Sequence, residues 1–451
     1  DLTHQWSVTP QMTWALDPNN KHSISADYRY NYHYNSSNSP LYLLHMLEGW
    51  NTADTQHELG MLPSTEEMLS TLDACNSSDS KTRVHSHTPN IRYTLRMDNA
   101  KTGSYSSLTL GISMPMRNEK MDYHRGMQVD TLMNRNTMFV NASINIFHDI
   151  FKRNRSISGG YSISHNAPSM TSLLDIRDDR NPLFITQGNP NLKSTRTHRF
   201  DATYRDKFGK TFFYINVNGY ITENAEASGF IYNKETGVRT ITPDNVNGNW
   251  NMYVSSRADF ALDPHEKWRL TDQLSYQYSH NVDLSGTNES LRATRSVVNS
   301  NYFTKDLAIN WRPTDKMEDS ANGKLTYQHS SSAREGFTDI NAFTFQYGIS
   351  GQIELPWNIQ CSTDLTMYSR RGYSEASMNT NELVWNARVA KRLMKGQLTI
   401  MFDGFDLLGN LSNVHRYINA QGRSETIYNM IPSYGLFHVI WRLNKQPQKN
   451  K

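Results

Sequence analysis

Within residues 21–34, positions 23–34 alternate strictly between polar side chains and apolar or aromatic ones. Tyr28 and Tyr30 fall on one side of this alternation, and Asp27 and Arg29 fall on the other. A period of two places successive side chains on opposite faces of a β-strand, so the segment predicts a strand with one apolar and one polar face. The pattern recurs along nearly the whole chain. Strands of this kind predict a barrel wall with an apolar outside and a polar inside.

The composition favours one continuous all-β unit. The chain has 451 residues, and no Pro/Ser/Gly-rich linker or block of charge divides it. Mean hydropathy is −0.68, and no run of about 18 apolar residues could span a bilayer as a helix. A barrel strand needs an apolar side chain only at every second position. We therefore predict a transmembrane antiparallel up-and-down β-barrel over residues 1–443, followed by a polar periplasmic tail at 444–451.

The connections between strands are of two alternating kinds. Alternating tight turns and long loops are typical of strands that run up and down through an outer membrane, with the turns on the periplasmic side. Turn-like segments are predicted at 17–20, 98–101, 149–154, 206–209, 263–265, 313–323, 355–356 and 394–396. Longer polar links are predicted at 35–82, 116–136, 166–195, 223–248, 282–298, 371–380 and 406–430, with one short link of this set at 334–339.

The segments between these links predict about 17 strands. Two consecutive strands show the division of faces clearly: Trp250 and Met252 oppose Asn251, and in the next strand Leu274 opposes Ser275. The clearest strands are predicted at 22–34, 136–148, 155–165, 196–205, 210–222, 249–262, 267–280, 340–355, 381–393 and 432–443.

Several segments carry a family resemblance. Residues 181–193, read as NPLFITQGNPNLK, and the strand that follows at 197–204 are the most specific of them. Residues 386–393, 398–402 and 406–410 are similar to late strands of the same family, and 434–443 is similar to a closing strand. Together they resemble the barrel of TonB-dependent outer-membrane receptors, in the branch of outer membrane β-barrel proteins.

The resemblance implies a fold and partners. Barrels of that family have 22 strands around a plug domain, so this chain corresponds to their last 17 strands. We expect an upstream segment that carries five strands, the plug and the energy-coupling box. The implied partners are outer-membrane lipid, the TonB complex acting through that segment, an extracellular nutrient and, as a further candidate, a surface lipoprotein.

Motifs for catalysis and cofactors are absent from the sequence, and we predict no enzyme and no cofactor and assign no catalytic, cofactor-binding or metal-binding residue. The net charge of +3 gives no case for nucleic acid. Cys75 and Cys361 lack the spacing of a metal or redox pair and are interpreted as inert thiols. His85 and His87 share one face of a strand; we interpret them as polar lumen or rim residues, with a metal pair as the alternative.

Charged and aromatic side chains are interpreted as structural. The loop with Asp175, Asp178 and Asp179 also contains Arg177 and Arg180, which favours a salt-bridged loop over a calcium or substrate contact. Aromatic residues on the apolar sides of strands are predicted to face lipid or to form interfacial girdles. They are Trp14, Tyr28, Tyr30, Trp250, Trp268, Trp311, Phe437 and Trp441. Arg29, Asp27, Arg257 and Asp259 are predicted to face the lumen and to pair there.

Three other functions stay open. The chain could be a surface receptor or scaffold that displays its loops without transport, or a passive channel. It could also be a soluble all-β protein that binds glycans, although a propeller requires a repeat near 40 residues that the sequence lacks. We predict, ahead of these, the barrel portion of a receptor for active uptake of a scarce nutrient in the outer membrane of a Gram-negative bacterium.

Overall fold

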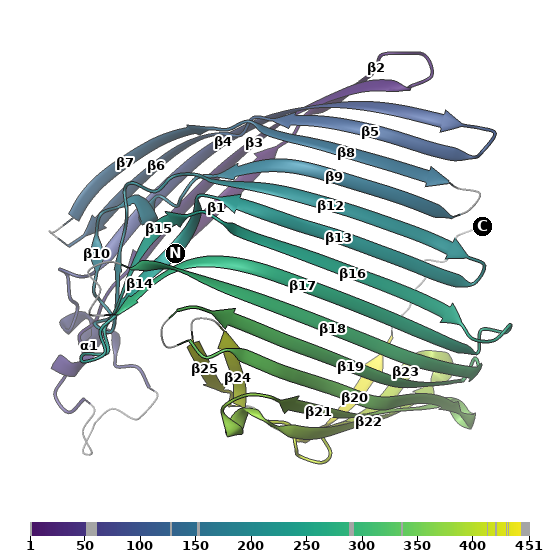
Figure 1. Ribbon diagram of the computed structural model, residues 1–451. Helices are drawn as coiled ribbons and strands as arrows, with labels where there is room; N and C mark the ends of the chain where they lie inside the picture. Colours follow the sequence, from purple (N-terminus) through teal and green to yellow (C-terminus); the bar gives the residue numbers. More distant parts are fainter. Residues whose placement is uncertain are drawn as a thin grey trace, which may run out of the picture.

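The computed structural model describes residues 2–50, 61–126, 129–150, 154–287, 293–334, 337–412, 414–419, 422–429, 431 and 433–442. Most of them form one strongly curved sheet whose long tilted strands follow one another in chain order (Figure 1). The predicted tail at 444–451 lies outside the described residues. In the part of the chain that is described, no helix is long and apolar enough to cross a membrane.

The wall consists of 17 antiparallel crossings among the described residues, which confirms the predicted number. Three crossings are interrupted once, two of them at Pro10 and Pro115, which cannot donate to the ladder. The crossings are β1 (Leu2–Val8) with β2 (Gln11–Ala15), β3 (His22–Ser39), β4 (Ser78–Asn99), β5 (Ser104–Ser113) with β6 (Met116–Arg125), β7 (Val129–Met138) with β8 (Asn141–Ile150), β9 (Arg155–Asn166), β12 (Thr195–Phe208), β13 (Thr211–Glu223), β16 (Asn249–Ala261), β17 (Trp268–Thr287), β18 (Thr294–Thr314), β19 (Met317–Ser332), β20 (Ile340–Leu355), β21 (Ile359–Arg371), β22 (Asn381–Leu393), β23 (Leu398–Phe405) and β26 (Tyr434–Trp441).

Short and long connections alternate between the two ends of the wall, as predicted. One end, which we call the turn end, holds short links such as 209–210 and 315–316. The other, which we call the loop end, holds long links such as 167–194. Figure 1 shows the helix α1 (Thr65–Ser70) and several short strands gathered there. The 3-10 helices are η1 (Leu44–Met46), η3 (Thr171–Leu173), η4 (Pro356–Asn358), η5 (Ala376–Met378) and η6 (Met394–Gly396).

Some predicted links are wrong in extent. The stretch 116–136, expected to be a loop, is largely the hairpin of β6 and β7, and much of 282–298 belongs to β17 and β18. These strands continue the wall beyond its apolar band, where both faces meet water and the apolar period disappears. The turn predicted at 313–323 is confined to residues 315–316, because β19 already begins at Met317.

Short strands within the long links pair with one another and with the wall at the loop end. Strand β11 (Phe184–Gln187) pairs in parallel with β15 (Arg239–Val246), and β14 (Ala225–Tyr232) pairs in parallel with the wall strand β17. The predicted loop 223–248 is therefore mostly the hairpin β14–β15. The short β10 (Arg177–Asp178) extends this arrangement, and β24 (Val414–Asn419) pairs separately with β25 (Gly422–Ile427).

The two faces of the wall differ as the alternation predicts. Trp250, Met252 and Leu274 are 38–39 % exposed on the outer, convex face. On the inner face, Ser255 of β16 lies directly opposite Ser275 of β17. Among the described residues, β1 and β2 pair only with β3, and β26 pairs only with β23.

Candidate functional site

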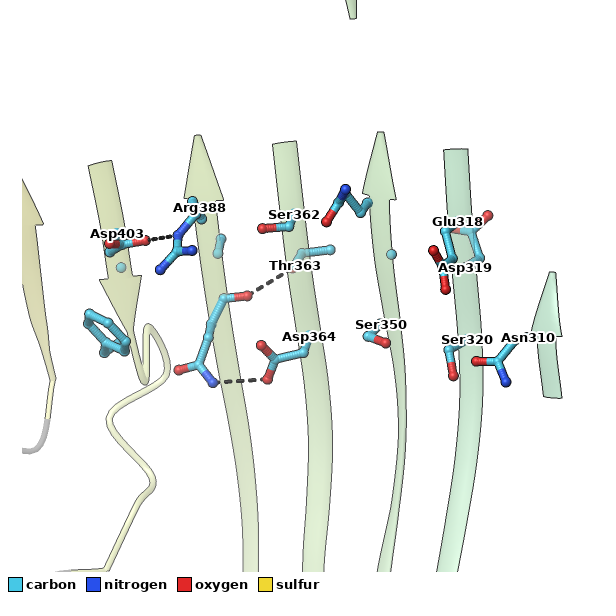
Figure 2. A pocket seen from close by; sticks show the side chains of 16 residues that line it. Asn310, Glu318, Asp319, Ser320, Ser350, Ser362, Thr363, Asp364, Arg388 and Asp403 are labelled. Carbon is cyan, nitrogen blue, oxygen red and sulfur yellow. Dashed lines mark hydrogen bonds and ion pairs between the residues drawn. The ribbon is translucent and has the colours of Figure 1, made fainter. Parts of the chain in front are cut away.

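A hollow on the inner face near the turn end is lined by polar side chains from β18 to β23. Its volume is about 600 Å³. The strand register places these side chains in two rows across the wall, because positions directly opposite each other in a ladder share a face. One row is Asn310, Ser320, Ser350, Asp364 and Asn386, and the other is Glu318, Gln352, Ser362, Arg388 and Asp403 (Figure 2).

Charge pairs fix the end of these rows. The buried carboxylate of Asp403 pairs with the Arg388 guanidinium, and its second oxygen lies 3.0 Å from Nε2 of His438. Asn386 donates through Nδ2 to Asp364 at 2.9 Å. Charged side chains held by hydrogen bonds make the inner face of the wall hydrated and rigid. Such a face suits a polar path through the barrel or contact with a polar domain inside it.

The predicted lumen charges do face the inside. Arg257 donates through Nε to Asp259 at 2.9 Å, as the prediction that these residues pair requires. Asp27 instead pairs with Arg92 of the neighbouring strand at 2.8 Å and also accepts from Asn90. Sequence reasoning missed Arg92 because the register of β3 against β4, rather than local spacing, brings it to Asp27.

The links of the loop end are tied together by a buried arginine. Arg125, 3 % exposed, donates to Asp179 at 3.1 Å, to the Arg177 carbonyl oxygen at 2.6 Å and to Asn76 Oδ1 at 2.9 Å. These partners come from two different long links, so one side chain crosslinks both. Both Nη atoms of this buried cation are engaged by acceptors, which offsets the cost of burying its charge.

The salt-bridged loop lies beside this arginine. Arg180 pairs with Asp178, with Nη2 2.6 Å from Oδ2. The hydrogen bond from Arg180 holds the pKa of the Asp178 carboxyl below its ordinary value. Asp175 accepts from Gln187 Nε2 at 3.1 Å. The carboxylates thus engage neighbouring protein groups within the loop.

The most specific sequence signature forms the base of the same loop. A Cβ on Gly188 would lie 1.8 Å from the Leu174 carbonyl oxygen, so only glycine fits this close approach. Asn189 donates through Nδ2 to the Pro243 carbonyl oxygen at 3.0 Å. The Lys193 backbone N–H donates to Asn245 Oδ1 at 2.6 Å. The signature therefore fastens the link 167–194 to strand β15.

A larger cavity, of about 770 Å³, opens at the loop end between β11, the hairpin β14–β15 and the ends of β17 and β18. Aromatic rings and arginines dominate its lining, notably Phe184, Phe230, Tyr232, Arg239, Arg295 and Arg334. Sequence reasoning missed it, since Phe184 meets Arg239 only through the parallel pairing of two loop strands. The one available signal was the alternation that ends in Phe230 and Tyr232 inside a predicted loop.

The histidine pair lies on the outer face. Tyr30 lies opposite His87, and Tyr32 lies opposite His85. The Nδ1 atom of His85 lies 2.7 Å from the Tyr30 hydroxyl, and that of His87 lies 2.5 Å from the Tyr28 hydroxyl. The interpretation as lumen residues is therefore wrong, because the register puts both imidazoles among outward tyrosines. A hydrogen-bonded aromatic belt of this kind suits a membrane interface.

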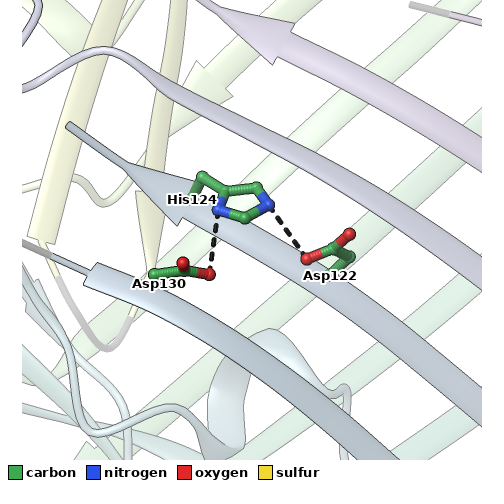
Figure 3. A group of neighbouring side chains, drawn as sticks. All are labelled: Asp122, His124 and Asp130. Carbon is green, nitrogen blue, oxygen red and sulfur yellow. Dashed lines mark ion pairs between the residues drawn. The ribbon is translucent and has the colours of Figure 1, made fainter. Parts of the chain in front are cut away.

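Another group of ligand-type side chains lies on strands β6 and β7 (Figure 3). His124 is 2.9 Å from Asp122 through Nε2 and 3.1 Å from Asp130 through Nδ1. Each ring nitrogen contacts a different carboxylate, so the imidazole lies between the two carboxylates. This is the geometry of an imidazole held between two carboxylates, and we assign no metal to it. Cys75 and Cys361 are both free thiols.

The interfacial aromatic residues take their predicted places. Trp268 and Trp311 stack near the turn end with ring centroids 5.4 Å apart. Phe437 and Trp441 are 69 % and 51 % exposed on the last wall strand. An antiparallel barrel wall with an apolar, aromatic outer face and a charged inner face defines an outer-membrane β-barrel protein.

Comparison with known proteins agrees with this class. Residues 117–306 match the model of the outer membrane protein beta-barrel family, in agreement with the resemblance to outer membrane β-barrel proteins. No curated protein matches the chain.

Among the solved structures similar to this chain are a copper transporter and two receptors. The copper transporter OprC aligns at 10% identity and a TM-score of 0.46, over 92% of this chain and 61% of that chain. The siderophore receptor PirA from Pseudomonas aeruginosa aligns at 9% identity and a TM-score of 0.41, over 98% of this chain and 71% of that chain. The ferric-catecholate import receptor Fiu from E. coli aligns at 11% identity and a TM-score of 0.32, over 97% of this chain and 74% of that chain. The chain thus spans less than two thirds of the copper transporter's length.

Proposed function

We propose that the chain is the barrel portion of a TonB-dependent outer-membrane receptor that takes up a scarce nutrient. The observation that carries the proposal is the combination of an ordered loop end, fastened by Arg125, with a charged inner wall below it. A binding end and a polar route then lie on one wall. The resemblance of residues 181–193 to the receptor barrels supports the energy-driven version of this function.

The chemistry proposed for the chain is transport without bond making. The loop end binds the nutrient, and the polar inner face provides the surface along which a hydrated ligand or a polar domain moves. Energy would come from the TonB complex, acting through a domain inside the barrel, as the family resemblance implies. A surface lipoprotein is a further partner that this role allows.

Uptake by living cells tests the proposal. Cells with and without the gene are given labelled ferric chelates, cobalamin, peptides and oligosaccharides at limiting concentration, each with and without an uncoupler of the proton-motive force. We expect one nutrient whose uptake needs both the gene and the proton-motive force. Uptake that needs the gene but resists the uncoupler would identify a passive channel. If no nutrient's uptake depends on the gene, the transport proposal is wrong and the receptor or scaffold role replaces it.

A further inference from the structure

The cavity at the loop end has the size and position of a small-molecule site. Its volume of about 770 Å³ falls within the usual range of ligand pockets. Phe184 and Tyr232 are 51 % and 43 % exposed, although large rings at a water-facing end are more stable when covered. Because β14 is paired with the wall strand β17, the cavity is fixed to the barrel.

Positive charge and flat rings meet on one face of this cavity. Arg239 lies directly opposite Phe184 on one side and Tyr232 on the other, so the three side chains share a face. The Arg239 guanidinium carbon lies 4.0 Å from the centre of the Phe230 ring. This stacking holds the planar cation in place while its edge stays available for hydrogen bonding.

Two buried polar atoms of the lining have no hydrogen-bond partner among the described residues. They are Nε of Arg239 and Oγ of Ser296, and Ser296 is only 8 % exposed. Buried donors are rarely left unmet in a folded protein, and a ligand is one means of meeting them. Arg239 Nε can only donate, and the Ser296 hydroxyl can donate as well as accept, so an acceptor group meets both atoms.

The remaining charges of the lining point to an anion. Arg295 and Arg334 add two guanidinium groups, and the described lining residues include no carboxylate. Arg295 donates to the Asn247 carbonyl oxygen at 3.2 Å, and Arg334 lies 5.5 Å from the Phe337 ring centre. Asp283 lies directly opposite Ser296 in the β17–β18 ladder, accepts from the Leu284 backbone N–H and is not part of the lining.

We infer that this cavity binds a ligand that joins an oxyanion, such as a carboxylate or phosphate, to a flat apolar ring. The oxyanion accepts from Arg239 and Ser296, and the ring lies against Phe184 or Tyr232. Guanidinium groups bind such oxygens in a planar, bidentate manner, which a neutral or cationic ligand cannot reproduce. The inference rests on the proposed function, in that it names the chemical class of the nutrient bound at the loop end.

Binding of phenyl phosphate to the purified full chain, measured by isothermal titration calorimetry in matched detergent, tests the inference. Inorganic phosphate and benzyl alcohol probe the anion and the ring separately. We expect phenyl phosphate to bind at least tenfold more tightly than either. Arg239→Gln should weaken it at least tenfold, whereas Arg239→Lys should weaken it less. Arg312→Gln at the turn end, which removes an equal charge far from the cavity, should leave binding unchanged.

Several results would overturn the inference. If Arg239→Gln and Arg312→Gln bind phenyl phosphate equally well, the cavity does not recognise the anion. If benzyl alcohol binds as tightly as phenyl phosphate, the same conclusion follows. Absence of phenyl phosphate binding by the folded wild-type chain would also end it. Phe230→Leu, which keeps every charge, provides a second variant and should weaken phenyl phosphate binding while the barrel keeps its heat-modifiable mobility in gels.

The uptake experiment separates this inference from the proposed function. Phenyl phosphate binding without any energy-dependent uptake would refute the transport role and leave the ligand class intact. Energy-dependent uptake of a nutrient that Arg239→Gln transports as well as wild type would refute the ligand class alone.

Discussion

A charge placed on the outer face of the wall should destabilise the barrel far more than the same charge on the inner face. Leu274 lies on the outer face of β17, and Ser275 follows it on the inner face. Leu274 is six residues from Trp268, which begins the strand at the turn end, or roughly 20 Å along it. With a tilt of about 40°, this is roughly 15 Å along the barrel axis, near the middle of an outer band about 25 Å tall that also carries the Asp272–Lys305 ion pair next to Leu274.

The expected cost follows from this depth. Arginine at the lipid midplane of a barrel costs roughly 2–4 kcal/mol of unfolding free energy. Leu274→Arg should therefore lower the folding equilibrium constant by a factor of about 30 to 1000. Ser275→Arg faces Ser255 and Thr304, which are small and polar, so its effect should stay within about 0.5 kcal/mol. The pair shares one strand and nearly one depth.

Urea titration of the barrel refolded into lipid vesicles measures the difference. The folded fraction is read from heat-modifiable mobility in gels and from tryptophan fluorescence. A second pair, Val254→Arg and Ser255→Arg on the neighbouring strand, repeats the comparison. If the outward and inward variants of both pairs lose the same free energy, the assignment of the two faces is wrong and the chain does not use this wall against lipid.

Three further outcomes follow from the charge pairs. Asp403→Asn should lower the unfolding free energy by about 1–3 kcal/mol, because a charge-assisted hydrogen bond to Arg388 is lost; vesicle urea titration measures it. Arg125→Gln should raise the rate of tryptic cleavage in the long links at least several-fold, with the wall strands still protected; unchanged cleavage would contradict its role as a crosslink. Arg180 lowers the pKa of Asp178, so the stabilisation from this pair is fully present above pH 3.8, the ordinary pKa, and is lost as the pH falls from 3.8 towards the pKa in the folded state. In that pH range, hydrogen exchange of the 167–194 link, corrected for the intrinsic rate, should increase in wild type but not in Asp178→Asn.

The wall was predictable from the sequence because lipid and lumen impose opposite demands on alternate residues. The strand predicted at 249–262 is observed as Asn249–Ala261, and that predicted at 381–393 is observed as Asn381–Leu393. Each has a continuous period of two, and a slip of one residue would turn every apolar side chain inward. The number of crossings follows from the same period.

The loop end was predictable only in position. Strand β15 carries polar residues on both faces, so its periodicity gave no signal, and the alternation in β14 is short. The apolar contact of Ala227 and Val246 with Val282 exists only after β14 pairs with β17. The cavity has the same origin. Phe184 and Arg239 become neighbours through a parallel pairing that sequence spacing does not encode.

The binding site proposed at the loop end is joined to the barrel wall by covalent and hydrogen-bonded continuity. The cavity rings stand on β14, which pairs with β17, and β17 continues through the apolar band to the turn end. Gly188 and Arg125 hold the neighbouring links in one arrangement. A ligand therefore meets a site that is already formed, and little of its binding energy is spent on ordering loops. A preformed site anchored on the wall captures a dilute ligand better than free loops would, which is the property a receptor for a scarce nutrient requires.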